Sequence, residues 1–148
     1  EDMACVAGGA EDDHLMALYM RNSWKTVFYV RELVIDAAGL PQPEPVVWAK
    51  PDEYSVLREK ALQGTNHYGF GVPFIQMQEY ICRESGGGLL RFPGLGSSCA
   101  AAEYEEDTLL ISELLAPDEH ILACAAGVLQ HLPAAQGKLR LVWRRAWR

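Results

Sequence analysis

The segment that most constrains the fold is the run CAAAEY-EED-TLLISELL. Two strand-like stretches, residues 99–104 and 108–115, flank a short turn made only of acidic residues. Apolar runs joined by a brief polar turn are typical of a β-hairpin, because neighbouring strands can then pair antiparallel. We therefore expect these two stretches to form adjacent antiparallel strands.

The sequence APDEHILACAAGVLQHL, residues 116–132, follows the predicted hairpin directly. Pro117 suits the first position of a helix, and Asp118 and Glu119 suit the first turn, where the helix dipole favours negative charge. The alanine-rich apolar positions that follow give the helix a face that can pack on a sheet. The sequence thus predicts a helix over residues 117–131.

The rest of the chain alternates between strand-like and helical patterns. Strands are predicted at 3–9, 25–35, 89–92 and 138–143, and helices at 11–24, 52–64 and 72–88. The order is β-α-β, then α-α-β-β-β-α-β. A hairpin followed by a helix and a further strand requires one parallel crossover within an otherwise antiparallel arrangement. The fold class predicted is mixed α/β, or α+β, with a partly antiparallel sheet flanked by helices.

A proline-rich stretch, DAAGLPQPEPVV at residues 36–47, separates the two halves of this order. Its three prolines remove backbone donors and restrict the residues before them. We expect residues 37–46 to lack regular structure and to act as a linker. The predicted organisation is a closing β-α-β unit at residues 1–40 and a second domain at residues 41–148.

Composition narrows the class of protein. The formal net charge of −7 argues against a nucleic-acid partner, because a phosphate backbone would be repelled. No apolar run approaches the length of a membrane span, and no membrane partner is expected. The four cysteines are widely spaced among apolar or small neighbours, which indicates reduced thiols in a cytoplasmic protein. Because the chain starts at Glu1 rather than at methionine, we expect a fragment or a processed product.

Few side chains of the sequence stand in patterns that are typical of a metal site or a catalytic site. His120 and Cys124 are four residues apart, but no third or fourth ligand at zinc spacing accompanies them, so no metal site is predicted. Glu113 lies among apolar residues in LLISELL, where an unpaired carboxylate would be costly. Three alternatives remain open for it: an outward orientation, a functional base or substrate-binding group, and a partner for an arginine. A hydrolase that uses Glu113 with His120 is a further, weaker hypothesis.

The stretch DDHLMALYMRNSW, residues 12–24, resembles a signature of the GCN5-related N-acetyltransferases. Members of this family carry a helix with a pattern similar to N-x-x-A-x-x-L-Y-x-x-x-G-F, followed by a strand. Leu18 and Tyr19 match this pattern, and Trp24 replaces its phenylalanine with another aromatic residue. The other family positions are occupied differently here, by Asp12, Leu15 and Ser23.

The resemblance implies a catalytic role for Tyr19. In the family, a tyrosine at this place often protonates the departing thiolate of coenzyme A, since a weak acid near the sulfur assists its departure. The alternative is a structural tyrosine that packs its ring under the following strand and leaves its hydroxyl at the surface.

Residues 98–132 resemble the central hairpin and following helix of the same family, which together with the first match suggests a tandem acetyltransferase. One departure stands out. The family carries a glycine-rich Q/R-x-x-G-x-G/A pattern at the strand-to-helix junction, where backbone amides hold the pyrophosphate of coenzyme A. Residues 116–120 supply instead a proline that lacks an amide hydrogen and two carboxylates, with no glycine. We expect this chain alone to bind acetyl-CoA weakly or not at all.

The function that the resemblance implies is acetyl transfer from acetyl-CoA to the amine of a small molecule or peptide. The chain would be part of that enzyme, and the second domain would shape the acceptor site or mediate homo-oligomerisation. The competing hypothesis is a non-catalytic acetyltransferase-like module that binds a partner or a small ligand.

Overall fold

The computed structural model describes residues 12–23 and 28–144. The helices in these ranges are α1 (Asp13–Arg21), α2 (Pro51–Leu62), α3 (Val72–Glu84) and α4 (Ile121–His131). The strands are β1 (Phe28–Asp36), β2 (Val47–Trp48), β3 (Gly88–Arg91), β4 (Cys99–Glu105), β5 (Thr108–Leu115) and β6 (Gln136–Arg144). Single turns of 3-10 helix occur at Ala37–Gly39, Pro93–Leu95 and Asp118–His120.

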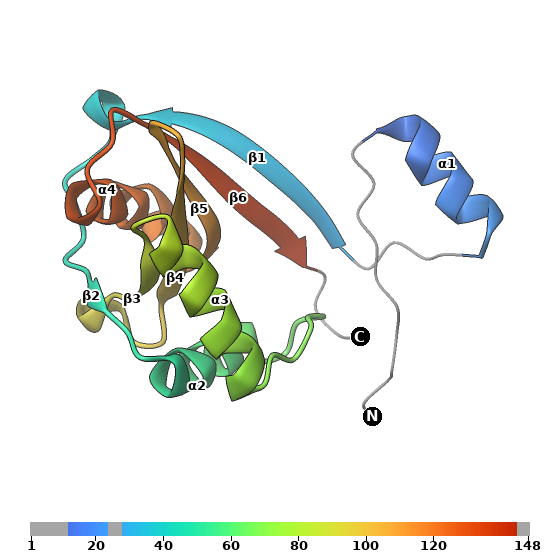
Figure 1. Cartoon of the computed structure of the whole chain (residues 1–148), viewed down its shortest axis with the longest axis horizontal. Coiled ribbons are helices and arrows are strands. Elements are labelled where there is room, and N and C mark those ends of the chain that lie inside the picture. The colour runs from blue at the N-terminus through green and yellow to red at the C-terminus, as the bar shows by residue number, and fades with distance from the viewer. Residues whose placement is uncertain (1–11, 24–27, 145–148) are drawn as a thin grey trace.

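Within the described ranges, six strands form one sheet in the order β1-β6-β5-β4-β3-β2. Every neighbouring pair is antiparallel except β5 and β6, which are parallel and joined through α4. Helices α2 and α3 cover one face of the sheet and α4 covers the other (Figure 1). This arrangement confirms the predicted mixed fold with a single parallel crossover.

The predicted hairpin is confirmed, whereas the helix after it begins later than predicted. β4 and β5 pair antiparallel from Glu105 opposite Thr108 to Cys99 opposite Leu115. The expected helical start at Pro117 is wrong, because α4 begins only at Ile121. Before it, the amide of His120 donates to the carbonyl of Pro117 at 2.9 Å, which closes a 3-10 turn. The predicted strand at 3–9 lies outside the described residues.

Strand β1 joins the sheet at its edge through a long antiparallel pairing with β6. The pairing runs from Phe28 opposite Arg144 to Asp36 opposite Gln136. β6 pairs with β5 only from Gly137 to Leu139, so β1 and β6 continue together as a ribbon beyond the rest of the sheet (Figure 1). β1 precedes the predicted boundary at residue 40 and yet shares a sheet with β6. The assignment of two domains stays a prediction.

The proline-rich segment is held against α4. It lacks regular structure from Leu40 to Val46, as predicted, although the turn at Ala37–Gly39 was not expected. The Glu44 amide donates to the carbonyl of Ala123 at 2.9 Å. A Cβ added at Gly127 would collide with the carbonyl oxygen of Glu44, so glycine is what allows the segment to lie so close to the helix.

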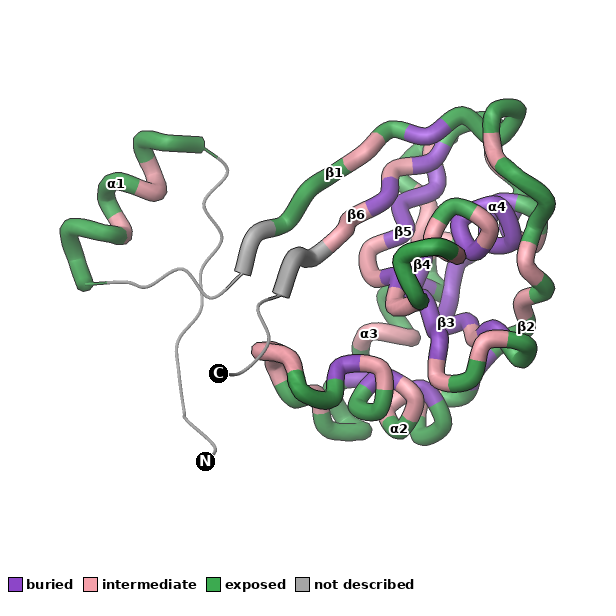
Figure 2. The backbone as a smooth tube through the Cα atoms, turned by 180° about the vertical axis from the view of Figure 1, so that it is seen from behind, coloured by how far each residue is buried: buried purple, intermediate pink, exposed green. Residues whose placement is uncertain are grey.

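The sheet separates two apolar cores (Figure 2). The core under α4 is the larger and contains Leu90, Phe92, Ile111, Val128 and Leu139, each fully or almost fully buried. The core under α2 and α3 contains Tyr54, Ile75, Leu89, Cys99 and Ala101. Tyrosine is the largest member of this second core, which places a polar hydroxyl where the first core has only apolar groups and a thiol.

Candidate functional site

A β-bulge in β5 decides which face of the sheet Glu113 occupies. Ala102 pairs with Ile111 and Ala101 pairs with Glu113, so Ser112 is an extra residue opposite this step. Leu109 and Ile111 point into the core under α4. Simple alternation would send Glu113 to the same side, but the inserted residue shifts the phase of the strand. Glu113 therefore faces α2 and α3.

On that face, Glu113 is bound by two side chains of α2. The Tyr54 hydroxyl donates to Oε1 of Glu113 at 2.8 Å. Nε of Arg58 donates to both carboxylate oxygens, at 3.0 Å and 3.2 Å. Tyr54 and Arg58 are one helical turn apart, which places both on the side of α2 that faces the sheet. We call these three residues the buried polar cluster.

Arg58 is one of the most buried side chains of the described structure, and its guanidinium group has several bonding partners. Its side chain is only 2% exposed. Nη1 of Arg58 donates to the carbonyl of Tyr68 at 2.7 Å, and its guanidinium carbon lies 3.9 Å from the centre of the Phe70 ring. Burial of a cation is tolerated when its charge is paired and its donors are used. The arrangement fixes the loop before α3 onto α2.

The surroundings of the cluster suppress ionisation of the other acidic groups there. Burial, and then the negative charge of Glu113, raises the pKa of Tyr54 well above its ordinary value. The same two causes raise the pKa of the Cys99 thiol to about 12. Neither group gives up a proton near neutral pH. Of the three alternatives for Glu113, the structure shows the arginine partner, and a substrate-binding role for Glu113 stays a prediction.

Tyr19 lies elsewhere in the molecule. It is on α1, whose start is capped by the Asp12 carboxylate, an acceptor for the Leu15 amide at 2.8 Å. None of the nine residues of α1 is buried, and Figure 1 draws the helix apart from the sheet. Tyr19 itself is partly exposed. The structure does not bring Tyr19 into the cluster around Glu113, and the catalytic role of Tyr19 stays a prediction.

The junction between β5 and α4 lacks the features that hold a pyrophosphate. The amide of His120 is bonded to the carbonyl of Pro117, and the amide of Ile121 to the carbonyl of Asp118. Pro117 contributes no amide hydrogen, and the exposed Asp118 and Glu119 add negative charge at the same place. A diphosphate needs several unused amides and little negative charge. The residues at this junction do not fit coenzyme A.

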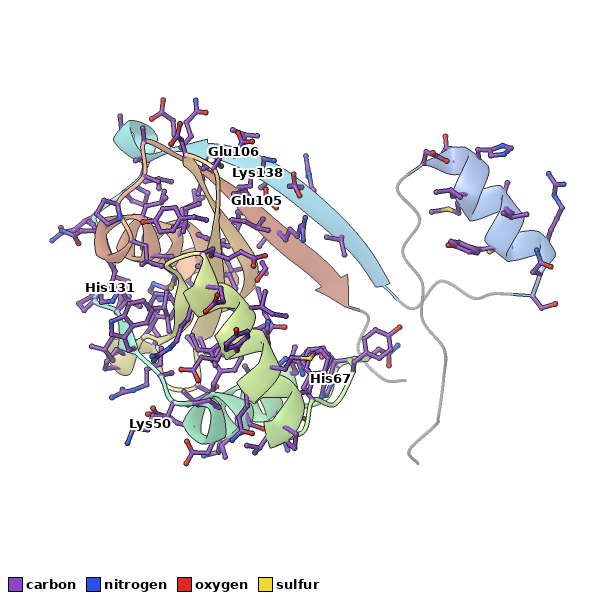
Figure 3. The ribbon with its side chains drawn as sticks, in the orientation of Figure 1. Lys50, His67, Glu105, Glu106, His131 and Lys138 are labelled. Atoms are coloured by element: carbon purple, nitrogen blue, oxygen red, sulfur yellow. The ribbon has the colours of Figure 1, made fainter. Side chains whose placement is uncertain are left out.

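Histidine and cysteine side chains do not gather into a metal centre in the part of the chain that the structure describes. His120 precedes α4, while Cys124 is buried within it. Nε2 of His67, in the loop after α2, lies 2.9 Å from the Glu59 carboxylate, and Nδ1 lies 2.8 Å from the Thr65 carbonyl oxygen (Figure 3). No helix among the described residues is long and apolar enough to span a membrane.

Tyr54 and Arg58 are not among the residues that the sequence predicts for a site. The sequence offered two signals. Tyr54 and Arg58 are spaced by four in a predicted helix, and Glu113 is a carboxylate among apolar residues in a predicted strand. These signals could suggest an arginine partner for Glu113 but could not select Arg58, which is 55 residues away in the chain.

Comparisons with known proteins identify the fold. No protein-family model and no curated protein matches the sequence significantly. Solved structures do match. A conserved protein from Enterococcus faecalis V583, described as a probable N-acyltransferase, aligns with a TM-score of 0.56 and 13% identity over 86% of this chain. A GCN5-related N-acetyltransferase from Sphaerobacter thermophilus aligns with a TM-score of 0.51 and 13% identity over 91%.

The chain has the fold of the GCN5-related N-acetyltransferases. Eis1 from Mycobacterium abscessus is also similar, with a TM-score of 0.53 and 13% identity over 88% of this chain. In each case the match spans less than half of the other protein: 36%, 49% and 37% of the three chains. At this identity the likeness establishes the acetyltransferase fold and leaves activity to be argued separately.

Proposed function

We propose that this chain forms part of an acetyl-CoA-dependent N-acetyltransferase, and that its six-stranded sheet is a supporting unit that does not bind coenzyme A. The acceptor would be the amine of a small molecule or a peptide. The fold supports the general class, since similar solved structures are described as N-acyl- or N-acetyltransferases. The partial coverage of those longer chains is consistent with a role as one part of a larger enzyme.

The observation that carries the supporting role is the junction between β5 and α4. Two amides at this helix start are already bonded within the 3-10 turn, and the adjacent positions carry a proline and two acids. The Glu113 carboxylate, under α2 and α3 near the middle of the sheet, is bound by Tyr54 and Arg58. The junction therefore offers no diphosphate cradle, and Glu113 is not an unoccupied base.

Catalysis would then depend on Tyr19, outside this sheet. The amine nitrogen would attack the thioester carbonyl, the carbon–sulfur bond would break, and the Tyr19 hydroxyl would give its proton to the departing thiolate. The proton lost by the nitrogen as the amide forms would restore the Tyr19 hydroxyl. The partial exposure of Tyr19 on a helix without buried residues is compatible with such contact.

Substitution of Tyr19 tests this role in the full-length protein. We expect Tyr19→Phe to lower kcat by about 10²-fold or more, the contribution typical of a positioned acid, while the affinity for acetyl-CoA changes little. Tyr80→Phe is the matched control, because Tyr80 is also a helical tyrosine and is 65% exposed. Unchanged turnover in Tyr19→Phe would leave Tyr19 as a packing residue.

A second candidate is a non-catalytic module that binds a partner or small ligand. The same junction favours it, because a sheet without a diphosphate site would have to serve a role other than binding coenzyme A. Assays of the full-length protein with acetyl-CoA and a panel of primary amines separate the two candidates. Release of free coenzyme A that depends on the amine supports the enzyme, and its absence under all conditions supports the module.

A further inference from the structure

An open groove lies between α3 and the sheet, on the same face as the buried polar cluster. Its volume is about 270 Å³. The walls are apolar: Phe70 and Phe74 stack with ring centres 4.2 Å apart, and Met77 and Ile81 continue the wall along α3. Phe74, Met77 and Ile81 are 42%, 50% and 51% exposed, which is unusual for three large apolar side chains along one helix face.

Two acceptors without donors lie in this apolar groove. Glu103, on β4, is only partly exposed, and its carboxylate has no hydrogen bond or ion pair with any described residue. Gln78, on α3, has a buried Oε1 that accepts no hydrogen bond. A partly buried carboxylate without a partner is costly, and it is stabilised most by a cation that donates hydrogen bonds.

The electrostatic surroundings also favour a cation. Burial first, and then the carboxylates of Glu103 and Glu79, raise the pKa of the Cys82 thiol in the groove to about 11. Glu79 is paired with Arg83 at 3.0 Å, which leaves Glu103 as the carboxylate available to a cation. Arg58 contacts Phe70 from α2, but its charge is paired with Glu113. Aromatic faces add to the attraction, because their quadrupole favours cations.

We propose that this groove binds a small primary ammonium ion with an apolar body, the ammonium against Glu103 and the apolar part against Phe74, Met77 and Ile81. The volume of about 270 Å³ lies just below the range of about 300–1,000 Å³ that is common for small-molecule sites, so the groove suits a compact ligand. The inference goes beyond acetyl transfer and stands or falls independently of it.

Calorimetry with 3-phenylpropylamine and its neutral isostere 3-phenylpropan-1-ol tests the site on this chain. The amine is protonated at pH 7, because alkylamines titrate near the pKa of lysine, about 10.4. We expect the amine to bind saturably and the alcohol at least about tenfold more weakly, since a charge-assisted hydrogen bond is lost.

Three variants locate the binding. Glu103→Gln should weaken binding of the amine about tenfold or more. Glu106→Gln is the control: it removes the same charge from the same hairpin, but at the exposed turn near Glu105 and Lys138 (Figure 3). It should leave affinity unchanged. Phe74→Ala should weaken binding severalfold by removing apolar contact. Glu103→Gln and Glu106→Gln should keep the unfolding temperature of the parent, because neither carboxylate belongs to an apolar core. Phe74→Ala also removes the stacking with Phe70, so circular dichroism checks its fold before binding is measured.

Saturable binding that is lost in Glu103→Gln and in Phe74→Ala, and kept in Glu106→Gln, supports the site. Absence of saturable amine binding overturns the proposal. So does equal binding of amine and alcohol, or parent-like affinity in either groove variant.

Discussion

The two faces of the sheet differ in chemistry. Under α4 the buried side chains are apolar, apart from a thiol, and the helix and the Leu40–Val46 segment close over them. Under α2 and α3 a tyrosine, an arginine and a glutamate are bound to one another, and the neighbouring groove remains open. The residue that separates the two environments is Ser112, whose insertion in β5 turns Glu113 from the first face to the second.

This difference suggests that the α4 face serves to pack the fold, whereas the α2/α3 face also leaves side chains accessible for binding. In the α4 face, close contact depends on small residues such as Gly127 and Ala125. On the α2/α3 face, the buried polar cluster binds α2 to the sheet. The neighbouring helix α3 leaves the side chains of Phe74, Met77, Ile81 and Glu103 accessible in the groove. Substitutions on the two faces should therefore fail in different ways.

The largest effect is expected from the buried polar cluster. Arg58→Ala leaves Glu113 and the Tyr68 carbonyl without their donors in a buried setting, and loss of one partner of a buried pair typically costs about 3–5 kcal/mol. Urea unfolding monitored by circular dichroism measures the change in the free energy of unfolding.

Arg83→Ala is the matched control on the same face. Its pair with Glu79, at 3.0 Å, is one helical turn apart and Arg83 is 64% exposed, so the expected cost is about 0–1 kcal/mol. Equal losses in the two variants would mean that the cluster is no more important to stability than a surface pair.

An intermediate effect is expected under α4. Gly127→Ala should destabilise by about 1–3 kcal/mol, because its new methyl group meets the Glu44 carbonyl and a backbone group cannot move aside as easily as a side chain. The better helix propensity of alanine offsets about 1 kcal/mol. Gly69→Ala, where nothing lies within 4 Å, is the control. Stabilisation by Gly127→Ala in the same urea assay would show that the segment is not packed on α4 as described.

The smallest change in the free energy of unfolding near neutral pH is expected from ionisation of the buried thiols. Burial raises the pKa of Cys99 and Cys124 to about 12, with Glu113 and Glu44 as the respective second causes. Both thiols stay protonated in the folded chain while those of an unfolded chain ionise near pH 8.5. Their contribution to stability is thus present below about pH 8.5 and decreases as the pH rises towards about 12.

Alkylation with iodoacetamide followed by peptide mapping checks this. Cys99 and Cys124 should remain unmodified in the native chain at pH 8 and react rapidly in urea. Similar rates at either cysteine with and without urea would place that thiol at the surface.

Local patterns in the sequence predicted the elements that depend on local physics. The hairpin of β4 and β5 and the two helices after the proline-rich segment follow from alternation, glycine stops and apolar spacing. β2 was missed because two residues, Val47 and Trp48, carry no period at all. The pairing of β1 with β6 joins residues a hundred or more positions apart and could not be inferred from either strand alone.

The site was less accessible to sequence reasoning. The cost of burying Glu113 was visible in its apolar neighbours, and an arginine partner was among the expected outcomes. Its side of the sheet depends on the bulge at Ser112, which no local pattern marks. The misfit of residues 116–120 to a diphosphate was predictable from Pro117, Asp118 and Glu119, because it is a matter of missing donors and added charge rather than of distant contacts.

Acetyl-CoA binding to this chain, measured by calorimetry at physiological salt, tests the central claim most directly. We expect no saturable binding in the micromolar range, because two amides of the junction are already bonded, Pro117 has no amide hydrogen, and Asp118 and Glu119 add negative charge. The double variant Asp118→Gly/Glu119→Gly should not restore tight binding, since Pro117 still lacks a donor. A micromolar dissociation constant for the parent chain, lost when residues 116–120 are altered, would contradict the claim that this sheet has no coenzyme A site.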